Sequence, residues 1–267
     1  MSTVTSKDGT TIAYAKTGQG PAVILASGAL SKGAEDAPLA ERLAPHFTVF
    51  TYDRRGRGSS GDTAPYAVER EVEDFAAVLQ AAGGSAYAFG SSSGGVLALE
   101  AASRLPAQVK KLAVFEPPFI VDDTRPRLPE NFVARMAELA AAGQRGEAVE
   151  YFMTQGVGVP AEFVAQMRAA PMWPEMEALA HTLSYDGTLM GDTMSGRPLA
   201  VPRWTAADMP ALVMDGGESP PWMRKGAAAL AALLPNAQYR TLPGQMHNLD
   251  PDAVTPILVE FFSGRNA

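Results

Sequence analysis

The sequence predicts an α/β fold with a mostly parallel central sheet, helices on both faces of the sheet and a helical cap inserted between two strands. Short apolar runs alternate with segments of helical periodicity along the chain, which is typical of a parallel sheet. One stretch between two such runs, residues 119–208, is far longer than a single crossover helix requires. A hydrophobic fraction of 46% and a charged fraction of 19% are typical of a globular protein with a full core.

The strands are predicted from the apolar runs. Residues 2–16 hold two β-rich stretches around an Asp-Gly pair at positions 8–9, a strong hairpin signal, so an antiparallel edge is expected there. Six further runs are expected to form the rest of the sheet: 22–25, 47–52, 86–89, 111–115, 211–214 and 238–242.

Apolar residues at helical spacing predict the helices that cover the sheet. Positions 68, 72, 75 and 79 define one helix, which is expected to end at the Gly-Gly pair 83–84. Positions 254, 258 and 261 define a closing helix near the C-terminus. Because proline fits best in the first turn of a helix, Pro256 is expected to lie in the first turn of this one.

The stretch 119–208 shows several short helical patterns, one of them carried by Phe132, Met136 and Leu139. We therefore divide the chain into an α/β core, residues 1–118 and 209–267, and a helical cap, residues 119–208. Seven of the twelve methionines fall in the cap, at positions 136, 153, 167, 172, 176, 190 and 194. Because methionine side chains are adaptable, they are compatible equally with a plastic apolar pocket and with simple packing of the cap onto the core.

Composition excludes or disfavours several classes of protein. The formal net charge of −7 repels phosphate backbones, so nucleic acid is not an expected partner. The absence of cysteine excludes disulfides, thiolate metal sites and cysteine nucleophiles. Residues 1–9 hold no long apolar run, so neither a signal peptide nor a membrane span is expected there, and a cytoplasmic location is the default. The sequence has no phosphate loop, dinucleotide fingerprint or His/Asp metal cluster, so neither a cofactor nor a metal is expected.

The sharpest functional signal is the run 90–94, Gly-Ser-Ser-Ser-Gly, between the strand 86–89 and a helical pattern. A sharp strand-to-helix turn that presents a nucleophile needs almost no side chain two residues before and after that nucleophile. Ser92 has glycine at both positions, whereas Ser91 and Ser93 do not. Ser92 is therefore the candidate nucleophile.

A serine hydroxyl is a weak nucleophile at neutral pH and needs an adjacent base. The chain has three histidines, and His247 lies just past the last strand, in the order of serine first and histidine last that one class of catalytic triad uses. His46 precedes a strand and is expected to be structural. His181 lies in the predicted cap, where it is expected to be packed or exposed on a helix; contact with the substrate is the alternative.

With these residues the chain resembles the α/β-hydrolase family, in particular its capped esterases, lactonases and cofactor-free haloperoxidases. The resemblance spans nearly the whole length and also rests on the run 53–60, Asp-Arg-Arg-Gly-Arg-Gly-Ser-Ser, which is similar to the family's Asp-x-Arg-Gly-x-Gly-x-Ser turn. The resemblance implies that this run is a structural turn. A basic ligand-binding loop is the alternative interpretation.

The resemblance also implies an oxyanion hole after the strand 22–25. The family usually has His-Gly there, and this chain has Ser27-Gly28-Ala29. Because a backbone donor does not depend on the side chain, the N–H groups of Ala29 and Ser93 are the expected pair. Ser27 is expected to hydrogen-bond either the substrate or its own loop.

The acid of the triad is where this sequence departs from the family. The usual aspartate after the strand 211–214 is replaced by Ser219, and serine cannot support an imidazolium as a carboxylate does. Glu116, at the end of the strand 111–115, is the first candidate, because open α/β sheets gather functional groups at strand carboxyl ends and haloalkane dehalogenases and some lipases carry their acid on this strand. Asp215 is the next candidate, and Glu218 or the absence of any acid is the remaining alternative. A structural role for Glu116 at the hinge into the cap is the other interpretation.

Ser92 as nucleophile implies an acyl-enzyme, so we expect a serine hydrolase that cleaves a carboxylic ester or lactone of a small apolar substrate. Two other hypotheses stay open: a cofactor-free lyase or carbon–carbon bond hydrolase acting on a natural-product-like ketone, and a hydrolase-like ligand-binding protein with a weakened triad. The expected partner is a small-molecule substrate, without nucleic acid or membrane. A homodimer is left open, and the physiological substrate cannot be read from the sequence.

Overall fold

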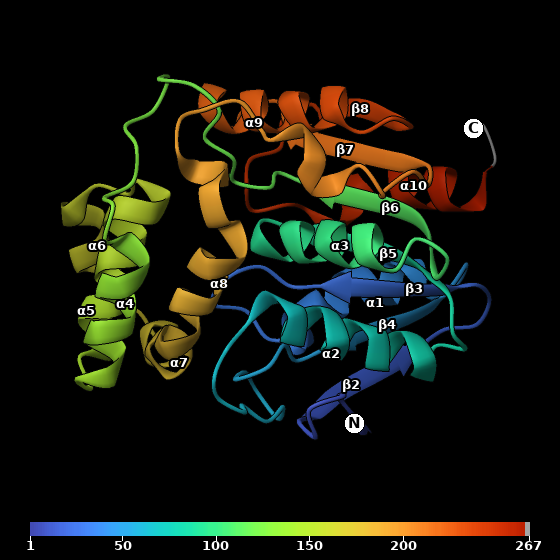
Figure 1. Ribbon diagram of the computed structural model, residues 1–267, viewed down its shortest axis with the longest axis horizontal. Coiled ribbons are helices and arrows are strands. Elements are labelled where there is room, and N and C mark those ends of the chain that lie inside the picture. The colour runs from blue at the N-terminus through green and yellow to red at the C-terminus, as the bar shows by residue number, and fades with distance from the viewer. Residues whose placement is uncertain (265–267) are drawn as a thin grey trace.

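The computed structural model describes residues 1–264, and within them eight strands form one sheet in the order β1-β2-β4-β3-β5-β6-β7-β8 (Figure 1). The strands β1 and β2 pair antiparallel, as do β2 and β4, and the remaining pairs are parallel. This sheet confirms the predicted α/β fold. The strands are β1 (Ser2–Thr5), β2 (Thr11–Thr17), β3 (Ala22–Ala26), β4 (Thr48–Tyr52), β5 (Ala86–Ser91), β6 (Val109–Phe115), β7 (Ala211–Gly216) and β8 (Ala237–Leu242).

Helices cover both faces of the sheet because side chains alternate between its faces along each strand. On β3, Ile24 packs into a hydrophobic cluster with α2, α3 and α9, whereas Val23 and Leu25 pack into a second cluster with α1 and α10. Figure 1 accordingly shows α2, α3 and α9 in front of the sheet and α1 and α10 behind it. These helices are α1 (Ala37–Leu43), α2 (Val68–Ala81), α3 (Ser93–Arg104), α9 (Pro221–Leu233) and α10 (Pro251–Ser263).

The closing helix α10 begins earlier than the sequence analysis placed it. The side chain of Asp250 caps the helix by accepting a hydrogen bond from the Asp252 N–H at 2.8 Å, so Pro251 takes the first helical position. The expectation that Pro256 lies in the first turn is therefore wrong, because Pro256 lies inside the helix. Phe262, rather than the expected Phe261, completes the buried face.

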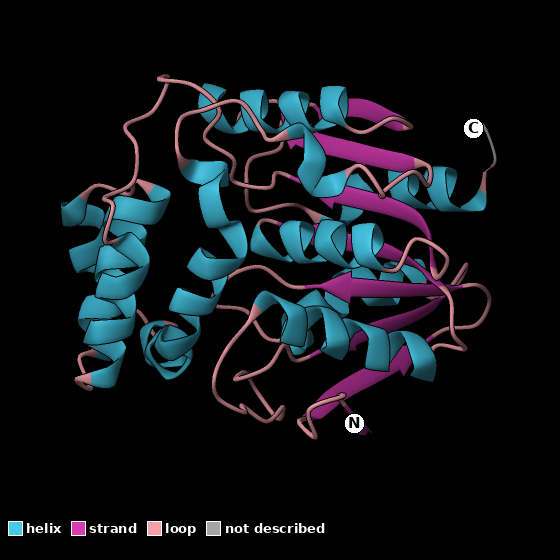
Figure 2. Cartoon of the chain, viewed as in Figure 1, coloured by secondary structure: helices cyan, strands magenta, loops and turns pink. Residues whose placement is uncertain are grey.

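Residues 119–208, which we call the helical insertion, connect β6 to β7 and lie beyond the carboxyl ends of the parallel strands (Figure 2). A hydrophobic cluster within it includes Phe132, Met136 and Leu183. Its description as a separate cap domain stays a prediction. Its helices are α4 (Phe132–Ala141), α5 (Arg145–Tyr151), α6 (Ala161–Met167), α7 (Trp173–Leu179) and α8 (Leu183–Met190). Among residues 1–264, none of the helices combines the length and apolar character needed to span a membrane.

Candidate active site

Ser92 lies on a tight turn between β5 and α3, with φ 55° and ψ −130°, a backbone conformation that is strained for a residue with a side chain. The flanking glycines are required by close backbone approach. A Cβ on Gly90 would lie 2.2 Å from the Gly94 carbonyl oxygen, and a Cβ on Gly94 would lie 2.1 Å from the Ala26 carbonyl oxygen. The turn thus holds Ser92 at the carboxyl edge of the sheet, where the parallel strands end.

Glu116 and His247 are in direct contact. Glu116 follows β6, is fully buried and has φ 45°. Its Oε1 accepts a hydrogen bond from the Gly216 N–H at 2.8 Å, and its Oε2 lies 2.8 Å from Nδ1 of His247. A carboxylate in this position favours the imidazole tautomer with the proton on Nδ1, which leaves Nε2 able to accept another proton. His247 and Ser92 line the same two cavities.

The other candidates for the acid have different partners. Asp215, at the end of β7, is also fully buried, but its Oδ2 accepts hydrogen bonds from Nε of Arg224 at 3.1 Å and from the Tyr239 hydroxyl at 2.7 Å. Glu218 is exposed, and its backbone N–H donates to the Gln245 carbonyl. The structure therefore places Glu116, and neither of these two, against the imidazole.

The other two histidines, His46 and His181, have different surroundings. His46 is exposed, with its ring 6.2 Å from that of Phe47. His181 lies in the helical insertion, with its Nε2 3.9 Å from the Asp62 carboxylate and its ring against Tyr185. Neither histidine is among the residues that line the two cavities beside Ser92.

The expected oxyanion donors flank Ser92. Ala29 follows β3 and lines both cavities with Ser92. The neighbouring Gly28 packs close to the nucleophile, because a Cβ on Gly28 would lie 3.2 Å from the Ser92 Cβ. Ser93 opens α3, so its N–H belongs to the first four of the helix, which have no partner within it. Both N–H groups therefore belong to backbone next to the nucleophile.

Ser27 bonds within its own loop. Its hydroxyl donates to Oδ2 of Asp36 at 2.6 Å. Burial raises the pKa of Asp36 to about 6, although the hydrogen bond from Ser27 acts in the opposite direction. Asp36 also lines the larger cavity, so this carboxyl forms part of its wall.

The cavities beside Ser92 measure about 520 Å³ and about 60 Å³. Six of the seven methionines of the helical insertion line them, as the pocket interpretation of these residues requires, and the seventh, Met136, is buried within the insertion. The larger cavity is lined by Met153, Met167, Met172 and Met176, and the smaller by Met190 and Met194.

The run 53–60 forms a turn whose three arginine side chains are buried, which favours the structural interpretation over a basic ligand-binding loop. The Asp53 carboxylate accepts hydrogen bonds from the backbone N–H groups of Gly33 at 2.9 Å and Ser59 at 2.8 Å. The Arg55 side chain is buried and forms a two-point ion pair with Asp74, at 2.7 and 2.8 Å. Arg54 pairs in the same way with Glu71 on α2. The charges of the first two arginines of the run are therefore already paired with carboxylates of the protein.

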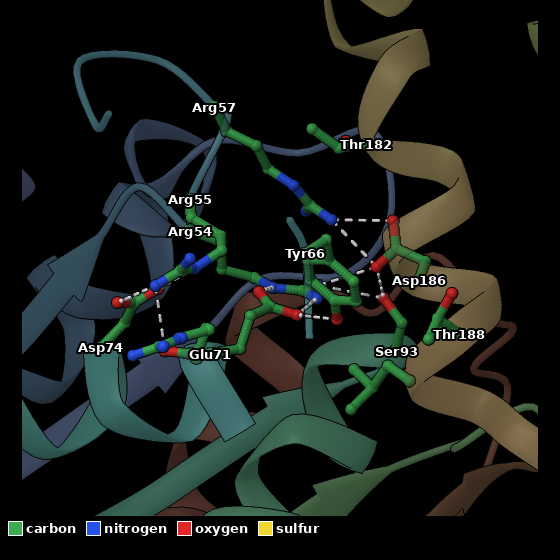
Figure 3. Close-up of polar contacts among 12 residues, drawn as sticks. Arg54, Arg55, Arg57, Tyr66, Glu71, Asp74, Ser93, Thr182, Asp186 and Thr188 are labelled. Carbon is green, nitrogen blue, oxygen red and sulfur yellow. Dashed lines mark hydrogen bonds and ion pairs between the residues drawn. The ribbon is translucent and has the colours of Figure 1, made fainter. Parts of the chain in front are cut away.

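Sequence reasoning missed Asp186, a buried carboxylate on α8. It accepts hydrogen bonds from Arg54 at 2.8 Å, from Arg57 at 2.7 and 2.9 Å and from the Ser93 hydroxyl at 2.7 Å (Figure 3). Burial alone would raise the pKa of Asp186, but the Arg57 and Arg54 guanidinium groups hold it below its usual value. The signal that could have predicted this partner is the run itself, because three buried arginines in four residues require buried acids.

Comparisons with known proteins place the chain in a family. Residues 23–257 match the family described as "Alpha/beta hydrolase family". A pimeloyl-[acyl-carrier protein] methyl ester esterase from Xanthomonas axonopodis pv. citri is 33% identical over 241 residues, which is 86% of this chain and 89% of that protein. The chain therefore belongs to the α/β-hydrolase family, as the sequence resemblance implied.

Solved structures agree with this assignment. An α/β hydrolase from Sphaerobacter thermophilus DSM 20745 is 58% identical, with a TM-score of 0.91 over 98% of this chain and 100% of that chain. An enol-lactonase from Burkholderia xenovorans LB400 is 22% identical, with a TM-score of 0.72 over 98% of this chain and 100% of that chain. At that level of identity the second similarity supports the fold alone.

Proposed function

We propose that this protein is a serine hydrolase that cleaves a carboxylic ester or lactone of a small apolar substrate through an acyl-enzyme. The coarser assignment, an ester hydrolase of the α/β-hydrolase family, is supported by the family match and by the esterase relative. The finer one rests on a single observation: the buried Glu116 carboxylate contacts His247, which shares its cavities with Ser92 on a strained turn.

In the proposed mechanism, Ser92 Oγ attacks the substrate carbonyl carbon while Nε2 of His247 takes the hydroxyl proton. Glu116 holds the ring and stabilises the imidazolium that forms. The Ala29 and Ser93 N–H groups donate to the negative carbonyl oxygen of the tetrahedral intermediate. Collapse of this intermediate expels the alcohol, which takes the proton from His247. Water then attacks the acyl-enzyme in the same way and releases the acid.

The cavities favour an apolar substrate. Methionine side chains adapt to ligands of different shape, so six of them around the nucleophile are suited to a flexible acyl or alcohol group. The relative from X. axonopodis is named for a methyl ester, and this supports the ester class rather than that particular substrate. A small-molecule partner, a cytoplasmic location and a homodimer remain predictions.

The two alternative hypotheses gain no support from the site. The ligand-binding hypothesis was motivated by the missing acid and by the replaced histidine of the oxyanion loop. Glu116 supplies a carboxylate at the imidazole, and backbone N–H groups can serve as oxyanion donors whatever the side chain. The lyase or carbon–carbon hydrolase hypothesis requires turnover of a ketone with little activity on simple aryl esters. A side-by-side assay of p-nitrophenyl esters and such a ketone separates it from the esterase.

The decisive experiment is covalent labelling with a fluorophosphonate, read by intact mass. We expect one adduct on the wild type and none on Ser92→Ala, together with a loss of p-nitrophenyl ester turnover by several orders of magnitude. Ser91→Ala is the matched control, because it removes a neighbouring hydroxyl from the same strand end and should retain the adduct. A wild type that forms no adduct and turns over no ester would refute the proposal.

A further inference from the structure

We propose that Arg57 and Asp186 are positioning residues that fix both donors of the oxyanion hole. Because Asp186 lies on helix α8, this helix would then help to orient the groups that stabilise the transition state. This inference rests on the proposed function, because it assigns a role in the same site. Arg57 lies in the turn 53–60 and Asp186 on the helical insertion. Both side chains are buried, and they point toward one another in Figure 3.

The Arg57 guanidinium holds the peptide group that supplies the first donor. Its NH1 donates to the Gly28 carbonyl at 2.5 Å. That carbonyl and the Ala29 N–H belong to one planar trans peptide unit, so they point in opposite directions. A hydrogen bond that fixes the carbonyl therefore fixes the direction of the Ala29 N–H. The same NH1 donates to the Ser31 carbonyl at 3.2 Å, so the turn is held on both sides of Ala29.

Asp186 holds the residue that supplies the second donor. Its Oδ1 accepts from the Ser93 hydroxyl at 2.7 Å, and both of its oxygens accept from NH2 of Arg57. Arg54 NH1 lies 3.3 Å from the Ser93 hydroxyl and 2.8 Å from Asp186 Oδ1. The Ser93 and Ala29 halves of the oxyanion hole are thus joined through one buried carboxylate.

The charge of Arg57 also acts on the donor. A guanidinium at the Gly28 carbonyl polarises the peptide and makes its N–H a stronger hydrogen-bond donor, and this effect is large in a buried, low-dielectric site. The Asp186 carboxylate is the counter-ion of this guanidinium. Burial and then Arg54 hold the pKa of Arg57 below its usual value, and the Asp186 carboxylate partly offsets this lowering, so the pairing favours the charged form.

Arg55 provides a matched comparison within the same turn. Like Arg57 it is a buried arginine held by carboxylates, but its partners are Asp74 on α2 and Asp8 near the N-terminus. In Figure 3 it points away from Asp186 and toward Asp74. A loss of stability without effect on the oxyanion hole is therefore the expected consequence of replacing Arg55.

The test compares Arg57→Gln with Arg55→Gln on folded enzyme, quantified by active-site titration. For Arg57→Gln we expect kcat on p-nitrophenyl esters to fall about 10- to 100-fold with KM nearly unchanged, because the oxyanion donors act in the transition state. Affinity for a boronic acid, whose adduct with Ser92 is tetrahedral and anionic, should fall by a similar factor. Arg55→Gln should lower the thermal midpoint but leave kcat within about threefold.

Equal kcat values for the two folded variants, or a change confined to KM, would overturn the inference. If Arg57→Gln does not fold, Arg57→Lys decides. Its ammonium retains the charge but cannot hold Gly28 and Asp186 with the fork of a guanidinium, so kcat should fall about tenfold, and an unchanged kcat counts against the inference. Failure of the proposed function is a different result, since the wild type itself would then show neither ester turnover nor an adduct.

Discussion

Two buried carboxylates, Glu116 and Asp215, lie at the carboxyl ends of the neighbouring strands β6 and β7, but they differ in backbone direction and in the groups they contact. Phe115 pairs with Met214, so Glu116 and Asp215 each lie one residue beyond the same register position. Asp215 continues its strand and pairs with Thr241, whereas Glu116 turns out of the sheet with φ 45°. The comparison teaches that a strand end brings an acid to the edge of the site, but the backbone direction decides what it contacts.

The consequence is chemical. The Glu116 carboxylate meets the Gly216 N–H and the imidazole of His247, so its charge is available to an imidazolium. The Asp215 carboxylate meets the Arg224 guanidinium and a tyrosine hydroxyl, so its charge already has a partner. Substitutions at the two positions should therefore affect different properties of the enzyme.

The largest effect is expected for Glu116→Gln. The amide keeps the shape of the side chain but cannot stabilise an imidazolium or hold the required tautomer, so kcat should fall about 10³- to 10⁴-fold. Steady-state kinetics on a p-nitrophenyl ester measure this, with circular dichroism as the control for folding. An unchanged kcat would mean that Glu116 is not the acid of the triad.

Asp215→Asn should have a smaller and different effect. The loss of the charge opposite Arg224 should lower the free energy of unfolding by about 1–3 kcal/mol, while kcat stays within about threefold. Urea denaturation and the same ester assay measure the two quantities. If this variant loses turnover as severely as Glu116→Gln, then the distinction between the two carboxylates is wrong.

The smallest effect is expected for substitution of Asp36, a third carboxyl near the site. Unlike Glu116 and Asp215, it contacts a serine hydroxyl rather than a histidine or an arginine. Burial raises the pKa of Asp36 from 3.8 to about 6, so the protonated, neutral carboxyl is more stable in the folded protein than in the unfolded chain. Its contribution to stability is full below pH 3.8 and is lost as the pH rises through about 6. Asp36→Asn should therefore raise the thermal midpoint by a few degrees at pH 8 and show no such gain at pH 3.5. Because the charge of the neighbouring Glu35 also raises the pKa of Asp36, the control is the exposed Glu130. Replaced by Gln, it should show no such pH-dependent gain.

Local patterns were sufficient to predict the elements that carry the site. Apolar runs and helical spacing predicted the strands and the helix α2, because burial on both faces of a parallel sheet imposes them. Ser92 followed from its two glycines, and Glu116 from its place at a strand end. The start of α10 was misplaced because the capping role of Asp250 was not considered beside the proline pattern.

Asp186 could not be predicted by the same means. It lies 132 and 129 residues along the chain from Arg54 and Arg57, and its contacts depend on how the helical insertion folds back onto the core. Short helical patterns predict helices within the stretch 119–208 but do not say which buried charge any of them meets. Long-range ion pairs of this kind leave only an indirect trace in the sequence, as unpartnered arginines in an apolar context.

The position of Asp186 limits how this enzyme can be recombined with its relatives. Among residues 1–264, Asp186 is the one carboxylate that pairs with Arg57, whereas Arg54 also has Glu71. A chimera whose inserted helices carry no acid at this position would leave a buried guanidinium without a counter-charge, which is strongly destabilising. Exchange of these helices for new specificity therefore requires either an aspartate at the matching helical position or a neutral residue in place of Arg57.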